Sequence, residues 1–303
     1  MSDGAYRLGD TEVTDEFAEA FPMRYARVVI TAATDAWALE AARSMTGFAT
    51  SVIGCKCEAA IERPLDAGET PDGRPGIAVL LFAMDSEGVG ERILERVGQS
   101  VMTCPTSACF DGLPDGEKRV AVGSALRYFG DGFQASKVVA GERFWRIPVM
   151  EGEFLCCESV GVDTGVAGGN LVFLGADDAH ALVAAQAAAD AMRGPGIALP
   201  FPGGIVRSGS KVGSLRSSSI PATTNHRMAP TLRAQVDDSF VPDGVGAVFE
   251  IVIDGVSEAA VRECMRRGLH AAADAGALQV TAANFGGDLG PFHFPLSELR
   301  DPP

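Results

Sequence analysis

Apolar and polar positions follow one pattern four times along the chain. A short apolar run is followed by a brief loop and then by a segment whose apolar residues recur at helical spacing. The apolar runs predict strands at 26–32, 76–84, 170–176 and 246–255, and the segments after them predict helices at 35–47, 85–101, 177–194 and 257–276. The chain therefore alternates strands and helices from its first third to its last.

The ends of these helices carry capping signals. Asp35 can cap the first helix and Gly47 can end it, while Ser257 can start the last helix and Gly276 can stop it. Shorter strand candidates follow the helices at 48–55, 100–105, 197–204 and 278–287. Segment 119–161 alternates apolar and polar residues between glycine turns, which predicts additional hairpins.

Strand–helix–strand units, two in each half, are typical of a split βαβ arrangement. The expected fold class is therefore α+β, with two tightly packed ferredoxin-like lobes and mainly antiparallel sheets. The lobes are expected at residues 1–150 and 151–303. A doubly wound Rossmann sheet is the alternative, and it is disfavoured because no glycine fingerprint follows the first strand.

Composition narrows the class of protein. The 303 residues carry a net charge of −15 and a pI near 4.7, which argues against binding to nucleic acid or to an anionic membrane surface. The acidic, polar start of the chain does not resemble a signal peptide, and the longest apolar run is too short to span a bilayer. We expect a soluble, cytoplasmic protein.

The seven cysteines form neither a disulfide framework nor a zinc pattern, so reduced thiols and no metal are expected. Cys104 and Cys109 are candidate nucleophiles, but a thiol needs a general base and the four histidines are scattered. Structural cysteines are the favoured interpretation.

One acidic residue interrupts the apolar run at 246–255. Side chains alternate faces along a strand, so Glu250 shares a face with Val248 and Val252. Phe249, Ile251 and Ile253 lie on the other face. A buried, unpaired carboxylate raises its pKa until it holds a proton, which suits proton transfer near pH 7. Two plainer interpretations remain open: an edge strand whose polar side faces water, or a buried glutamate paired with an arginine.

Glycine-rich stretches offer candidate binding loops. Segment 201–214, FPGGIVRSGSKVGS, imitates a phosphate loop, but its Ser–Lys order is reversed, so an ATP site is disfavoured. Its backbone and Lys211 could hold an anionic ligand tail, or the segment could be an ordinary turn. Gly168 and Gly169 could let a flat ligand approach the backbone, or could form a bulge. The polar stretch 98–112 could be a pocket wall or a capped loop, and the Pro-Asp-Gly in 69–76 predicts a turn.

These stretches together resemble one family. The matching segments are DEFAEAF, TGFATSVIGC, ETPDGRPG, GQSVMTCPT, YFGDGF, IPVMEGEF, TGVAGGN, FPGGIVRSGSKVGS, PATTN, FEIVI and NFGGDLG, which run in order from about residue 15 to 299. The family is formylmethanofuran:tetrahydromethanopterin formyltransferase. The resemblance implies two ferredoxin-like lobes and a homotetramer built from dimers.

The resemblance also implies a reaction and site residues. The substrates would be tetrahydromethanopterin and a methanofuran-type carrier, with direct formyl transfer between two nitrogens and no tightly bound cofactor. Glu250 matches the family's candidate catalytic carboxylate. Asparagines and backbone amides in the glycine turns are candidate oxyanion donors, and Arg207 would face an anionic ligand group. The substrate-binding candidates are Thr103, Pro105, Thr106, Gly168, Gly169, Asn170, Gly203, Gly204, Ser210, Lys211 and Asn225.

The excess of arginine over lysine is closer to that of a methylotrophic bacterium than of an archaeon. The similar bacterial protein is the transferase subunit of a formyltransferase/hydrolase complex. It would pass the formyl group from 5-formyl-tetrahydromethanopterin to the methanofuran analogue for hydrolysis to formate by partner subunits, in formaldehyde oxidation. A non-catalytic scaffold subunit of such a complex is the alternative from another class.

Overall fold

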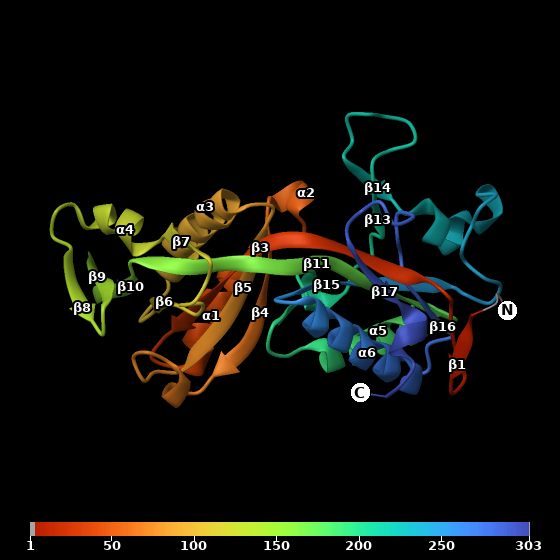
Figure 1. Cartoon of the computed structure of the whole chain (residues 1–303), viewed down its shortest axis with the longest axis horizontal. Coiled ribbons are helices and arrows are strands. Elements are labelled where there is room, and N and C mark those ends of the chain that lie inside the picture. Colours follow the sequence, from red (N-terminus) through yellow and green to blue (C-terminus); the bar gives the residue numbers. More distant parts are fainter. Residues whose placement is uncertain (1–3, 303) are drawn as a thin grey trace. The chain divides into compact units, whose positions relative to one another are not determined.

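The structure, a computed structural model, describes residues 4–302, and the chain divides into two compact units (Figure 1). The first unit comprises the N-terminal residues up to Phe21, then Val166–Arg193, then Phe201 onward. The second comprises Pro22–Gly165 and Gly194–Pro200. Two long strands, β3 (Phe17–Thr31) and β11 (Ser159–Gly175), contribute residues to both units.

The second unit is built on a four-stranded antiparallel arrangement. Along the chain come β3, α1 (Asp35–Thr46), β4 (Glu58–Leu65), β5 (Gly76–Ala83), α3 (Ser86–Arg96) and β6 (Ala108–Asp111). In space the strands run in the order β4–β5–β3–β6. Every residue of β5 is buried, because neighbouring strands flank it and α1 and α3 pack against it. This burial accounts for its unbroken apolar sequence.

Additional hairpins extend this unit, as the alternation in 119–161 predicts. They comprise β7 (Lys118–Ala121), β8 (Ala135–Val139), β9 (Glu142–Val149) and β10 (Gly152–Cys157). β10 pairs with β6 in parallel. Short helices also occur: α4 (Gly123–Leu126) and 3₁₀ turns at Ala67–Glu69 and Arg127–Gly130.

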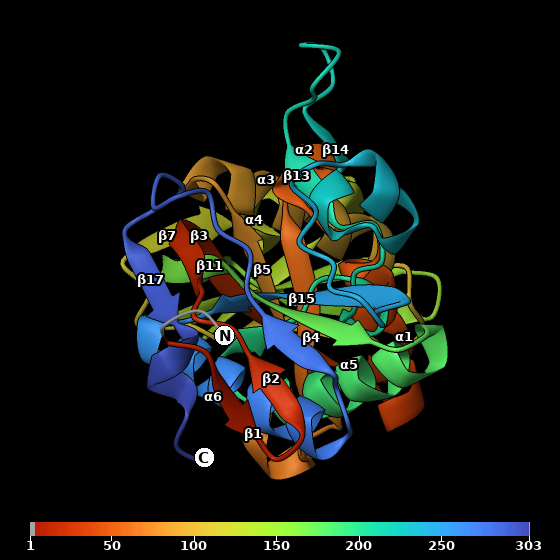
Figure 2. The same cartoon turned by 90° about the vertical axis from the view of Figure 1, so that its right-hand side faces the viewer.

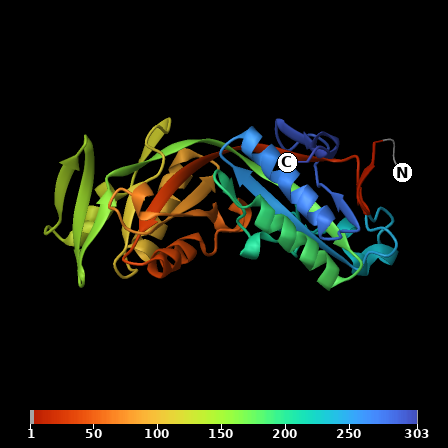
Figure 3. The same cartoon turned by 90° about the horizontal axis from the view of Figure 1, so that it is seen from below.

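The first unit places two helices on one face of a sheet. β11 is followed by α5 (Asp178–Met192), β15 (Ala247–Gly255), α6 (Glu258–Asp274) and β16 (Gln279–Thr281). The strands run in the order β15–β11–β16, and β2 (Thr11–Val13) and β1 (Tyr6–Leu8) extend that edge (Figure 2). Helices α5 and α6 lie side by side (Figure 3). A Cβ on Gly169 of β11 would lie 2.9 Å from Val261 of α6, so this face closely approaches the helices.

The remaining elements of the first unit are short. β17 (Phe292–Pro295) pairs with β3, and β13 (Ser210–Val212) pairs with β14 (Ala222–Thr224) as a separate hairpin. The loop of that hairpin projects from the unit in two views (Figures 1 and 2). The 3₁₀ turns are Pro202–Gly204, His226–Met228, Pro230–Gln235 and Leu296–Leu299.

The helix ends agree with the capping signals except at one residue. The side chain of Thr34, not of Asp35, accepts the hydrogen bond from the Trp37 amide and caps α1. Gly47 ends that helix. Ser257 caps α6, and Gly276 lies beyond its end at φ +84°.

Two predicted short strands are wrong and two are truncated. Segment 48–55 contains α2 (Val52–Cys55), because the Ser51 side chain caps it and Lys56 closes it in the left-handed region. Segment 100–105 continues α3 through a π-helical turn, Val97–Val101. In 197–204 only β12 (Ile197–Ala198) is a strand, and in 278–287 only β16 is.

The sheet is mixed, which corrects the prediction of mainly antiparallel sheets. β2 pairs in parallel with β16, as β6 does with β10. Both parallel pairs join strands far apart in sequence, whereas a short hairpin connection produces only antiparallel neighbours. Within residues 4–302, no helix is long and apolar enough to cross a bilayer.

The junction between β11 and α5 depends on a glycine, which gives a stability prediction. A Cβ on Gly175 would lie 2.4 Å from the backbone nitrogen of Ala181, so Gly175→Ala would force the helix away from the strand. We expect it to lower the free energy of unfolding by about 1–3 kcal/mol in denaturant titrations. Gly68→Ala is the control, because no atom lies within 4 Å of its Cβ position. Equal stability of the two variants would contradict this account of the junction.

Candidate active site

Glu250 lies in a strand that is hydrogen-bonded on both sides. Its Cα pairs with that of Val172 in β11. On the other side its amide donates to the Val206 carbonyl at 3.0 Å, and its carbonyl accepts from the Val206 amide at 2.7 Å. The edge-strand interpretation is therefore wrong at this residue.

The face that carries Glu250 is apolar. Val172, directly opposite, belongs to a buried cluster with Leu174, Val241 and Val245, and Val248 packs against that cluster. Phe249, one residue earlier, lines a cavity beside α5 with Leu182 and Gln186. The two neighbours thus take different environments, as the alternation along the strand predicts.

Burial gives the Glu250 carboxyl group unusual proton affinity. Desolvation raises its pKa from 4.5 to about 7. The residue as a whole is only half-buried, so the carboxyl group is desolvated while a ligand could still reach it. Within residues 4–302 no side chain forms an ion pair or hydrogen bond with this carboxyl group, so the arginine-paired interpretation is not what the structure shows. Such a group can exchange a proton near neutral pH.

Asn170 lies on the same face, diagonally across from Glu250. It pairs with Val252, two residues along β15. Its side-chain Nδ2 donates to the Ala283 carbonyl at 2.8 Å, and its Oδ1 accepts from the Ala283 amide at 2.7 Å. The amide therefore holds the chain after β16, which leaves one N–H for any ligand.

Gly168 and Gly169 form a bulge in β11. The register with β15 shifts between Val166 and Gly169, and Gly168 has φ +91°. The Gly168 amide donates to Oδ1 of Asp254 at 3.2 Å. The sequence allowed either a bulge or a ligand contact at these glycines, and the bulge is present.

The segment that imitates a phosphate loop has no helix after it. Gly203 and Gly204 form a 3₁₀ turn at positive φ, while Ser210 and Lys211 lie in β13. Asn225 precedes the turn His226–Met228. A phosphate loop presents its lysine at the start of a helix, so this geometry disfavours the ATP-type interpretation.

A cavity of about 590 Å³ adjoins this segment, and Glu250 is not among its lining residues. Arg207, which is exposed, and Arg193 line it with Phe249 and Phe201. Arg193 is already engaged, because it donates to the Gly203 carbonyl at 2.9 Å and lies 3.6 Å from Asp190. Arg207 is the better placed of the two to meet an anionic group.

Thr103, Pro105 and Thr106 belong to the second unit, in the loop after the π-helical turn. Thr103 and Pro105 are exposed, and the Thr103 hydroxyl donates to the Gln99 carbonyl at 2.8 Å. Thr106 has φ +65°, a conformation that is rare and strained for a β-branched residue. Strain of this kind persists only where the surroundings hold it.

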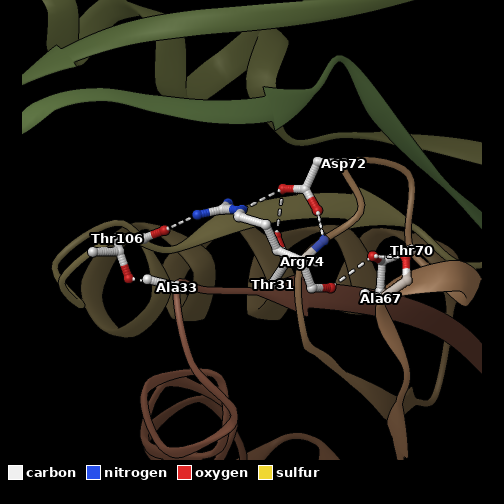
Figure 4. A network of polar contacts seen from close by, with 7 residues as sticks. All are labelled: Thr31, Ala33, Ala67, Thr70, Asp72, Arg74 and Thr106. Carbon is white, nitrogen blue, oxygen red and sulfur yellow. Dashed lines mark hydrogen bonds and ion pairs between the residues drawn. The ribbon is translucent and has the colours of Figure 1, made fainter.

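Figure 4 shows two of the contacts that hold Thr106, whose amide also donates to Glu151. Arg74 Nη1 donates to the Thr106 carbonyl at 2.5 Å, and the Thr106 hydroxyl accepts from the Ala33 amide at 3.0 Å. Arg74 is itself fixed by Asp72 at 2.8 Å and by the Thr31 hydroxyl at 3.0 Å. The turn at 69–76 therefore carries a guanidinium that shapes a candidate binding loop, a role that its Pro-Asp-Gly signal did not reveal.

Neither candidate thiol is suited to be a nucleophile. Cys109 is fully buried in β6. Burial, with the charges of Glu151 and Glu40, raises the pKa of the Cys104 thiol and so reduces its thiolate fraction. His180 and His270 lie in α5 and α6, and neither is a neighbour of Cys104 or Cys109 in sequence.

Comparison with known proteins gives a consistent result over the whole chain. The family model for formylmethanofuran–tetrahydromethanopterin formyltransferase matches residues 7–149, and the model for the proximal lobe of that family matches 152–299. The Methylococcus capsulatus protein of that name is 51% identical over 297 residues, which cover 96% of this chain and 99% of the relative. A component of the Methylorubrum extorquens formyltransferase/hydrolase complex is 48% identical, covering 100% of this chain and 99% of the relative.

Solved structures agree. The Methylorubrum extorquens formyltransferase/hydrolase complex, crystallised with methylofuran, contains a chain with a TM-score of 0.95 and 47% identity, covering 99% of this chain and all of that one. The Methanosarcina barkeri enzyme gives a TM-score of 0.92 at 44% identity, covering 97% of this chain and all of that one. The chain therefore belongs to the formylmethanofuran–tetrahydromethanopterin formyltransferase family.

Proposed function

We propose that this protein transfers a formyl group directly between N5 of tetrahydromethanopterin and the amine of a methanofuran-type carrier, with Glu250 as the catalytic acid and base. The observation that carries the proposal is the Glu250 carboxyl group, which is desolvated on an apolar face, has no partner in the described chain and has a pKa near 7. The relatives named as formyltransferases support the substrate class.

The chemistry requires one proton to change place. The acceptor amine attacks the formyl carbon and forms a tetrahedral intermediate, and the bond to the donor nitrogen then breaks. The attacking nitrogen loses a proton and the leaving nitrogen gains one. A carboxyl group with a pKa near 7 can take the first proton and deliver the second without a large free-energy cost in either direction.

The remaining site residues are proposed to bind the carriers. Thr103 and Pro105 are exposed for contact, with Thr106 beside them. Arg207 and Lys211 would meet carboxylate or phosphate groups of a carrier tail. Within the first unit, the backbone at Gly168, Gly169, Gly203 and Gly204, with Ser210, Asn170 and Asn225, would supply further carrier contacts and oxyanion donors.

The physiological setting is inferred from the relatives. Because one of them belongs to a formyltransferase/hydrolase complex, we infer transfer from 5-formyl-tetrahydromethanopterin to the furan carrier, followed by hydrolysis to formate on partner subunits. A homotetramer, a cytoplasmic location and the absence of a tightly bound cofactor belong to the same proposal. So do ferredoxin-like lobes divided near residue 150. The second unit has the βαββαβ order of such a lobe.

Glu250→Gln tests the proton-transfer role. We expect it to fold, to bind both carriers and to lose about a hundredfold or more in kcat for transfer from 5-formyl-tetrahydromethanopterin to methanofuran. The wild-type rate should change through an inflection near pH 7 that the variant lacks. Glu153→Gln, at an exposed ion pair in the second unit, is the control. An active wild type with an equally active Glu250→Gln would show that Glu250 is only structural.

The order of substrate binding distinguishes the mechanisms. Direct transfer requires both carriers together, so initial rates should follow ternary-complex kinetics. Ping-pong kinetics with a formyl group on Cys104 would contradict it. A wild type that binds neither carrier and transfers nothing would favour the scaffold alternative.

The same carboxyl group predicts a stability effect. Its folded-state pKa lies above the usual 4.5, so the folded protein holds this proton more tightly than the unfolded chain does. Glu250 therefore contributes a destabilisation that grows as the pH rises from about 4.5 to 7. Glu250→Gln should raise the free energy of unfolding by about 1–3 kcal/mol at pH 8 and not at pH 4. If Glu250→Gln and the wild type have the same free energy of unfolding at pH 4 and at pH 8, the carboxyl group is not desolvated.

Arg74→Met tests the loop at 103–106. Loss of the guanidinium removes the hydrogen bond to the Thr106 carbonyl, so the strained conformation should relax. We expect the KM for one carrier to rise about tenfold, with the inflection near pH 7 retained. Arg63→Met, at a nearby exposed ion pair with Glu69, is the control. If both variants keep the wild-type KM, this loop does not bind a carrier.

A further inference from the structure

A buried carboxyl group in β3 organises the loop at 284–290. The side chain of Glu19 is fully buried. It accepts hydrogen bonds from the backbone amides of Phe285 and Leu289, the latter at 3.4 Å. Its Oε1 lies 3.8 Å from Nε2 of His293, and within residues 4–302 no lysine or arginine forms an ion pair with it. Burying a carboxyl group is costly, so these contacts fix the loop to a particular shape.

The loop is also pinned at both ends. Asn284 donates to Oε2 of Glu16 at 2.9 Å and accepts from the Gly286 amide at 3.1 Å. At the far end, Nε2 of His293 lies 3.1 Å from the Gly290 carbonyl. A Cβ on Gly290 would lie 2.4 Å from the Ala20 carbonyl, so the loop lies tightly against β3. Asn284 and the Phe285 and Leu289 amides thus contact the protein itself, whereas Asp288 is exposed.

The loop at 284–290 leaves one aromatic side chain, that of Phe285, accessible to solvent. Phe285 is 46% exposed, and Gly286 and Gly287 follow it at φ +77° and +93°, where glycine is the residue of choice. Phe285 therefore offers an accessible aromatic face on a held loop, with no side chain on the two residues that follow it. Flat aromatic ligands stack on such surfaces.

The loop begins beside the Glu250 face. Across that face Glu250, Val172 and Thr281 lie in one row, because each pairs with the next on the neighbouring strand. Ala283 is tied to Asn170 in the adjacent row and packs against the cluster that contains Val172. The loop therefore starts two strand spacings, about 10 Å, across the sheet from the strand of Glu250, and one residue pair along from the Glu250 row.

We propose that the loop at 284–290 is a subsite for the planar heterocyclic ring of one carrier, with Phe285 as the stacking residue and Glu19 as the positioning residue that shapes the loop. This subsite rests on the proposed formyl transfer, because it identifies which part of a carrier lies against the Glu250 face. The shared chemistry is a flat ring, which is supplied by the pterin of one carrier and the furan of the other.

The test measures binding separately from transfer. Dissociation constants for 5-formyl-tetrahydromethanopterin and for methanofuran are determined by calorimetry on wild type, Phe285→Ala, Phe285→Tyr and Glu19→Gln. We expect Phe285→Ala to weaken one carrier about tenfold or more and Phe285→Tyr to restore it. The carrier that is affected identifies the ring. Phe133→Ala, at an exposed ring of the second unit, is the control.

Glu19→Gln separates shaping from folding. It keeps an oxygen for one amide but turns an N–H₂ toward the other. We expect weaker binding of the same carrier, with the inflection near pH 7 and the circular-dichroism spectrum of the folded protein retained. If Glu19→Gln does not fold, the affinities of Phe285→Ala and Phe285→Tyr alone test the subsite. Unchanged affinity for both carriers in Phe285→Ala overturns the subsite, whether or not the wild type transfers formyl. An inactive wild type overturns only the proposed reaction.

Discussion

The desolvation of the Glu250 carboxyl group is the physical constraint around which the first unit is arranged. Left in water, Glu250 would be fully ionised at neutral pH and would make a poor proton donor to a leaving amine. The strand keeps the side chain on this face, because backbone hydrogen bonds to β11 and to Val206 hold the strand from both sides. The apolar cluster beneath Val248 and the helices on the opposite face maintain that position. The free-energy cost of the buried acid is thus offset by the rest of the unit, and proton exchange near neutral pH is the result.

Most polar side chains around the candidate sites form hydrogen bonds to backbone groups of nearby loops. Asn170 binds the chain at Ala283, Glu19 binds the amides of the loop at 284–290, and Arg74 binds the carbonyl of Thr106. Each of these groups is engaged inside its own unit, so its main contribution is to fix the shape of a loop. The residues left free to touch a ligand are less polar or are exposed, such as Phe285 and Thr103. Pre-formed loops of this kind reduce the ordering cost of binding.

The sequence predicted those features of the fold that depend on interactions between residues close together in the chain. Alternation along 246–255 assigned Glu250 to its face, and capping signals located most helix ends. The short strand candidate at 48–55 failed because Ser51 offered a competing helix cap. The roles of Arg74 and Glu19 could not be predicted, because their partners lie 32 and 266 residues away in sequence. A Pro-Asp-Gly turn and an acidic strand residue look ordinary until the fold brings those backbones to them.

The same burial that tunes Glu250 bears on the fate of the formyl group. An apolar face orders little water, so in the proposed reaction water would compete poorly with the second amine for a formyl carbon held there. The alternative route through a thiol is poorly supported, because Cys109 is buried and the pKa of the Cys104 thiol is raised. Hydrolysis needs water as a reactant, whereas direct transfer is favoured where water is scarce. In the proposed function, hydrolysis on a partner subunit would keep that water away from this face, and one relative is a subunit of a formyltransferase/hydrolase complex.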